Sequence, residues 1–170
     1  GSSISSVYKG NVIIPSSVEY DGKTYSVTKI HEYAFGNCTY LMNITIPSSV
    51  ISIGYNSFSG CTALDNITIP NSVTNIGYEG FSGCTGLTNI TIPNSVTNIG
   101  GRAFYGCASL TNVTVPNSVT NIGSGAFANC PNLPVESNIQ YAGNWAVGLT
   151  DSKQVSYTLR NNTVGLAEGL

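Results

Sequence analysis

The sequence predicts a β-rich repeat solenoid with parallel strands on one side of each coil and short turns or 3₁₀-helical turns on the other. Three observations lead to this fold class: a repeat of 23 residues, an alternation of apolar and polar side chains within each repeat, and a proline directly after that alternation. The repeat is clearest in the cysteines, which recur every 23 residues: Cys38, Cys61, Cys84, Cys107 and Cys130.

The alternating segment predicts the strand. In the unit at residues 71–93, Ile90 and Ile92 alternate with Asn89 and Thr91. This two-residue period is typical of a strand with one buried face. Proline has no N–H group to continue a hydrogen-bonded ladder, so we expect the strand to end at the proline that follows.

The rest of the unit predicts the turns. Phe81, Cys84 and Leu87 follow one another at intervals of three, which suits short helical turns better than a strand. The residue before each cysteine is always Asn or Gly, the two residues that best tolerate a left-handed backbone. We therefore expect positive φ angles at one corner of every coil, at Asn37, Gly60, Gly83, Gly106 and Asn129.

A 23-residue coil cannot cover its own apolar side chains, so the coils must stack around a shared core. We expect columns of phenylalanine, cysteine and leucine in that core: Phe58, Phe81, Phe104, Cys61, Cys84, Cys107, Leu64, Leu87 and Leu110.

The cysteines are predicted to be free thiols. Equivalent residues in stacked coils lie about 5 Å apart with parallel Cβ directions, whereas a disulfide needs converging Cβ atoms about 3.8 Å apart. A zinc site needs ligands that converge, often as C-x-x-C pairs, and the sequence contains no such pair. We therefore expect no metal site and no cofactor.

The two ends depart from the repeat, which divides the chain into three parts. Residues 1–32 form a partial repeat with a β-hairpin that turns at Asp21-Gly22, and residues 33–133 hold the regular repeats. Residues 134–170 contain a hairpin-like insertion with a turn predicted at 148–153, and then the start of a further unit. Trp145 is expected to plug the last coil, and Leu166 to take the position that Ile76 has in the regular repeat.

The repeat L-x-x-I-x-I-P followed by S-V-x-x-I-G-x-x-x-F-x-x-C resembles the 23-residue leucine-rich repeat of BspA-like bacterial surface proteins, also called the Treponema type. It departs from the commoner leucine-rich pattern at Ser49, Ser72, Ser95 and Ser118, where that pattern has Asn or Cys. The resemblance implies a secreted or cell-surface protein of a host-associated microbe, in a family that includes adhesins for host matrix proteins.

Composition and charge exclude several function classes. Only 8% of the 170 residues are charged and the net charge is −2, so there is no basic surface for nucleic acid. No apolar run approaches the roughly 18 residues of a membrane helix, so we expect no membrane insertion of this piece of chain. The only histidine, His31, occupies a slot that holds glycine in the later repeats, and no phosphate loop or catalytic motif is present. The sequence therefore predicts no enzyme.

Candidate binding residues fall into two groups. On the strand side, outward-facing columns of asparagine and threonine contain Asn66, Thr68, Asn89, Thr91, Asn112 and Thr114. The simplest interpretation of these columns is structural, with amides and hydroxyls hydrogen-bonded along the stack; the functional one is a shallow groove for a glycan or an extended protein segment. On the turn side, where the repeats vary, Tyr55, Tyr78 and Tyr105 combine contact area with a hydroxyl group.

We therefore expect a non-enzymatic extracellular binding module, adhesin-like, that recognises a host protein or glycan. The near-identity of the repeats at residues 65–123 favours an alternative, a structural stalk or spacer that projects another domain. A third class, an accessory domain of an enzyme, would depend on sequence beyond Leu170.

Overall fold

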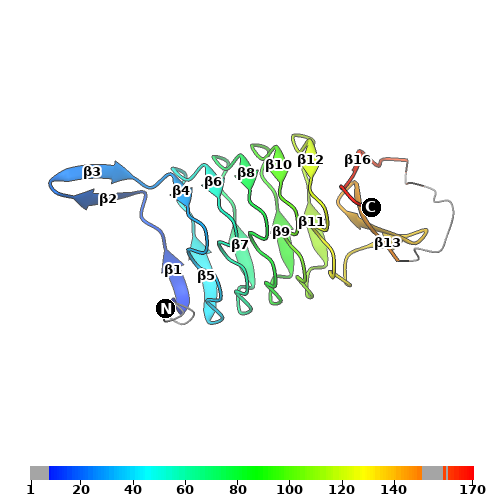
Figure 1. Ribbon diagram of the computed structural model, residues 1–170, viewed down its shortest axis with the longest axis horizontal. Helices are drawn as coiled ribbons and strands as arrows, with labels where there is room; N and C mark the ends of the chain where they lie inside the picture. Colours follow the sequence, from blue (N-terminus) through cyan, green and yellow to red (C-terminus); the bar gives the residue numbers. More distant parts are fainter. Residues whose placement is uncertain (1–7, 151–158, 160) are drawn as a thin grey trace.

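The computed structural model describes residues 8–150, 159 and 161–170. They form a row of stacked coils, with strands and turns but no helix in the described part of the chain. Figure 1 shows the coils side by side along the long axis, with one hairpin extending past the first coil and a separate β unit beyond the last. The solenoid predicted by the repeat is therefore present.

The alternating segments form the first column of strands. Its members lie on consecutive coils: β1 (Gly10–Ile13), β5 (Leu41–Thr45), β7 (Asn66–Thr68), β9 (Asn89–Thr91) and β11 (Asn112–Thr114). Pairing is parallel, and equivalent repeat positions oppose one another, as in Asn43 opposite Asn66. The ladder is interrupted once, because β1-β5-β7 and β9-β11 form separate sheets.

A second column of short strands was not predicted from the sequence. It is a continuous parallel sheet of five two-residue strands: β4 (Lys29–Ile30), β6 (Ser52–Ile53), β8 (Asn75–Ile76), β10 (Asn98–Ile99) and β12 (Asn121–Ile122). Each contributes one buried isoleucine to the core. A strand of two residues is too short to show an alternation of apolar and polar side chains, so the sequence pattern does not predict these strands.

The core consists of the expected columns. All nine predicted core residues are fully buried: Phe58, Phe81, Phe104, Cys61, Cys84, Cys107, Leu64, Leu87 and Leu110. The phenylalanine rings stack face to face from Phe35 to Phe127, with centroids 5.1–5.3 Å apart and planes within 8° of parallel. Tyr8 packs on the first ring at 5.0 Å.

The turn side contains turns closed by hydrogen bonds between residues three apart, such as Cys84 N to Phe81 O at 3.2 Å. Positive φ occurs at the predicted corner, from 58° at Asn37 to 73° at Gly60. A second row of positive φ was not predicted: Tyr33, Asn56, Glu79, Arg102 and Gly125. Non-glycine residues rarely adopt this conformation, so the coil path imposes it on side chains that do not favour it.

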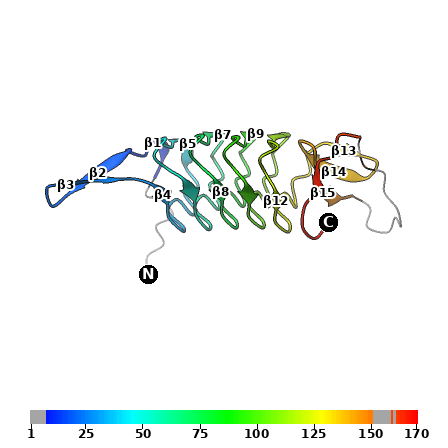
Figure 2. The same cartoon turned by 90° about the horizontal axis from the view of Figure 1, so that it is seen from above.

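The ends of the chain are two distinct additions. The predicted hairpin is formed by β2 (Ser17–Tyr20) and β3 (Lys23–Ser26), joined at Asp21-Gly22, and it projects away from the coils (Figure 2). The other end is a four-stranded sheet: β13 (Val135–Glu136), β14 (Ile139–Ala142), β15 (Trp145–Leu149) and β16 (Gly165–Leu166).

Within this C-terminal unit, β14 and β15 form a hairpin that turns at Gly143 and Asn144. The turn was predicted at 148–153, but Gly148 and Leu149 belong to strand β15, and residues 151–153 lie outside the described residues. Trp145 is only 7% exposed and belongs to the main core, as expected of a plug. The expectation for Leu166 is wrong. Leu166 is 54% exposed, and Ala167 is buried in its place. The N–H of Glu168 bonds to Ile122 O, so Ala167 rather than Leu166 occupies the isoleucine position of this last turn.

Candidate binding site

Most polar columns of the solenoid are used internally. Ser49, Ser72, Ser95 and Ser118, the positions that depart from the commoner leucine-rich pattern, each donate a hydrogen bond to a valine carbonyl of the preceding coil, at 2.5–2.9 Å. Asn75, Asn98 and Asn121 form an amide ladder with bonds of 2.7 and 2.9 Å. These side chains hold coils together and leave little capacity for a ligand.

The strand-face columns differ, because most of their members make no hydrogen bond along the stack in the described structure. In the described structure, the side chains of Asn66, Thr68 and Thr91 make no hydrogen bond to another residue, and Asn89 bonds only to Thr88 in its own coil, at 3.1 Å. Amide bonding along this column occurs only at its start, from Asn43 to Asn11 at 3.0 Å. The outward amides and hydroxyls of β7 and β9 therefore keep donors and acceptors available to a ligand.

Four of the predicted residues come together around one hollow. A depression of about 460 Å³ is lined by Asn66, Thr68, Asn89 and Thr91, together with residues that follow each strand: Ile69, Pro70, Asn71 and Pro93. A smaller hollow of about 220 Å³ continues over β5 and β7. Asn112 and Thr114 lie on β11, outside the lining. The prolines were predicted as strand ends, but no signal in the sequence marked them as part of a site.

The hollow lies where the strand ladder is interrupted. The strands β7 and β9 lie side by side (Figure 1), yet no backbone hydrogen bond joins them in the described structure. The facing backbone N–H and C=O groups there are not paired with each other, so they are available to solvent or to a ligand.

Two of the predicted tyrosines pack against each other. Tyr55 and Tyr78 stack with ring centroids 5.5 Å apart and planes 11° from parallel, and Tyr33 meets Tyr55 edge-on at 5.2 Å. The pKa of Tyr55 is raised above its ordinary value, mainly through a hydrogen bond with Tyr33. Because the rings face each other, they offer mainly their edges and hydroxyls to a partner.

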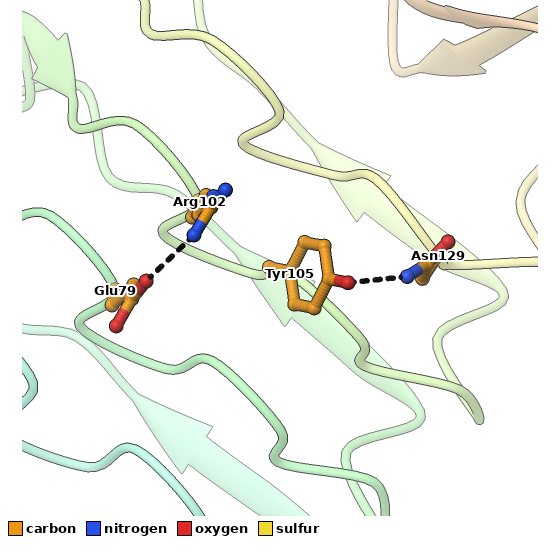
Figure 3. Close-up of polar contacts among 4 residues, drawn as sticks. All are labelled: Glu79, Arg102, Tyr105 and Asn129. Carbon is orange, nitrogen blue, oxygen red and sulfur yellow. Dashed lines mark hydrogen bonds and ion pairs between the residues drawn. The ribbon is translucent and has the colours of Figure 1, made fainter.

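Tyr105 belongs to a different group of contacts. Figure 3 shows its hydroxyl accepting a hydrogen bond from Asn129 Nδ2 at 2.7 Å, and Arg102 reaching Glu79 at 3.5 Å. The Arg102 guanidinium also lies 5.6 Å from the centre of the Tyr105 ring. This group links three consecutive coils at an exposed surface, where such contacts contribute modestly to stability.

The residues that could support catalysis are separated. His31 is exposed on the first coil, and all five cysteines are buried free thiols. Among the residues that the structure describes, no group of three His, Cys, Asp or Glu side chains converges on a metal position. None of the described segments is a helix long and apolar enough to cross a membrane.

The stacked 23-residue coils define a leucine-rich repeat protein. Residues 11–134 match the BspA type leucine-rich repeat region in six copies, so the chain belongs to that family. Membership indicates a protein-binding repeat module. A comparison with curated proteins finds no match.

Solved structures agree with this assignment. The crystal structure of the T. pallidum leucine-rich repeat protein is 34% identical, with a TM-score of 0.69 over 92% of this chain and 68% of the other. A leucine-rich repeat protein from Bacteroides ovatus is 37% identical over 72% of this chain, with a TM-score of 0.62. The match spans 38% of the B. ovatus protein. A leucine-rich cell surface protein from Faecalibacterium prausnitzii is 33% identical, with a TM-score of 0.54 over 69% of this chain and 38% of the other.

Proposed function

We propose that the chain is an extracellular, adhesin-like binding module that recognises a host protein or glycan through its strand face and carries out no catalysis. One observation carries this proposal. The side chains of Asn66, Thr68 and Thr91 are exposed without partners, whereas the serine columns and the Asn75–Asn98–Asn121 ladder are hydrogen-bonded within the solenoid. A surface that keeps its hydrogen-bonding groups free is suited to contact another molecule.

The comparisons support a location on the cell surface. One similar structure is described as a leucine rich cell surface protein, and another, 25% identical with a TM-score of 0.55 over 71% of this chain and 32% of its own, as a pneumococcal vaccine antigen. Both descriptions fit a protein exposed to a host.

The test is binding of the protein to an array of host matrix proteins and glycans. A strand-face variant, Asn66→Ala/Asn89→Ala, is measured beside a turn-side variant, Tyr55→Ser/Tyr78→Ser. We expect a saturable signal that the strand-face variant loses by about tenfold or more and the turn-side variant keeps. A signal lost only in the turn-side variant would place the contact on the tyrosines and contradict the proposal.

A structural spacer is the second candidate. The near-identical repeats at residues 65–123 favour it, because identical coils encode no unique site by their residues alone. If the wild-type protein binds nothing on the array, the result would support the spacer and count against the binding module.

A further inference from the structure

The hollow between β7 and β9 lies at a break in the strand ladder although its sequence is repeated. Residues 66–70 and 89–93 both read N-I-T-I-P. Strands β5 and β7 pair in register, and so do β9 and β11, whereas β7 and β9 are not paired with each other. The larger depression, of about 460 Å³, lies at this interruption. Backbone path, rather than residue identity, therefore makes this place different from the other coils.

The polar side chains of the hollow are uncharged, and those of Asn66, Thr68 and Thr91 make no hydrogen bond to another described residue. Three carboxamides, from Asn66, Asn71 and Asn89, and two hydroxyls, from Thr68 and Thr91, line it. Each of these groups can both donate and accept hydrogen bonds. No lining residue carries a charge, so an ionised group on a ligand would gain no ion pair there.

The hollow is also partly apolar. Ile69, Pro70 and Pro93 contribute hydrocarbon surface to its lining. A volume of about 460 Å³ lies within the range of roughly 300–1,000 Å³ that small ligands occupy. No aromatic residue is among those that line the hollow, whereas protein contacts commonly depend on large aromatic anchors.

We propose that this hollow binds one or two residues of a neutral glycan. A sugar ring presents hydroxyls that donate and accept, which match the carboxamides and threonines, and C–H surfaces, which match the prolines. The inference rests on the proposed function, since it names the ligand class for the same strand face. The glycan has two sources, a free polysaccharide or a chain carried on a host glycoprotein, and the recognition chemistry is shared.

The first experiment uses calorimetric titration with free neutral oligosaccharides: lacto-N-tetraose, mannopentaose and cellotetraose. Asn89→Ala is compared with Asn112→Ala, which removes the same side chain from the same repeat position one coil outside the hollow. We expect at least one oligosaccharide to bind, Asn89→Ala to weaken it by about tenfold, and Asn112→Ala to change it by less than about twofold. Equal losses in the two variants, or no binding of any of the three, would overturn the proposal.

A second arm separates the sources and tests charge. Asialofetuin, whose exposed glycans are neutral, is bound before and after enzymatic removal of its glycans, and sialylated lacto-N-tetraose is compared with the neutral form. We expect deglycosylation to abolish glycoprotein binding and sialylation to give no gain. Asn89-dependent binding that survives deglycosylation would overturn the glycan inference but leave the proposed function intact. Binding indifferent to Asn66 and Asn89 would contradict both.

Discussion

The thiol of Cys84 donates a hydrogen bond to the carbonyl oxygen of Phe58 in the preceding coil, over a distance of 3.1 Å. The same bond recurs from Cys61 to Phe35, from Cys107 to Phe81 and from Cys130 to Phe104, at 3.0–3.2 Å. Cysteine therefore serves here as a small apolar residue that also gives a second hydrogen bond to a carbonyl, such as Phe58 O, which already accepts the N–H of Cys61. Alanine at this position would donate no such bond between coils.

The buried thiols should be unreactive in the native protein. All five cysteines are free and buried, so we expect slow labelling by a chromogenic thiol reagent under native conditions and rapid labelling of five thiols per chain in denaturant. Rapid labelling of all five in the folded protein would contradict this arrangement.

The same thiols should make the fold sensitive to alkali. Burial raises the pKa of Cys61 from 9.0 to about 12, and burial likewise raises the pKa of Cys84. The fold favours the neutral thiol, so this contribution to stability is complete below pH 9 and is lost as the pH rises from about 9 towards about 12. We expect the urea midpoint to fall across that window.

Tyrosines and lysines also titrate in alkali, so a control variant is needed. Cys61→Ala removes one buried thiol and should show a shallower fall of its urea midpoint above pH 9 than the wild type. Parallel curves for the two proteins would argue against a contribution from Cys61.

A buried serine offers a stabilising substitution. Ser57 is fully buried and its hydroxyl has no hydrogen-bond partner, whereas equivalent positions hold Ala34, Ala103 and Ala126. Ser57→Ala should stabilise the protein by about 1 kcal/mol, because it removes an unsatisfied buried polar group. Thermal unfolding measures the effect. Ser95→Ala is the control, and its loss of a 2.6 Å bond to Val73 should destabilise by a similar amount.

The 23-residue spacing of the repeat predicts the features that every coil shares. The interval of 23 residues locates Phe58, Cys84 and Leu87 in the core, and the Asn or Gly before each cysteine locates one positive-φ corner. These features follow from stacking identical units, so the sequence of one repeat is enough to predict them for every coil. The free state of the thiols follows from the same spacing.

Features that depend on how two particular coils meet could not be predicted in this way. The hollow lies between β7 and β9, which have the same residues, so no difference in sequence marks the interruption of the ladder. The second positive-φ row was hidden because it includes Glu79 and Arg102, residues that disfavour this conformation. Leu166 was misplaced because the insertion before it shifts the register of the last turn.

A column of glycines sets the spacing of the coils and gives a sharp test of the packing. A Cβ atom at Gly77 would lie 2.8 Å from the carbonyl carbon of Gly54 in the preceding coil, closer than real Cβ contacts. Gly77→Ala should therefore force the coils apart and cost about 2 kcal/mol or more of unfolding free energy. His31 occupies the same slot on the first coil, where its side chain is exposed. His31→Ala should change stability by less than about 0.5 kcal/mol. Chemical denaturation measures the unfolding free energy of both variants. Equal losses for Gly77→Ala and His31→Ala would mean that close backbone contact is not the reason for glycine at this repeat position.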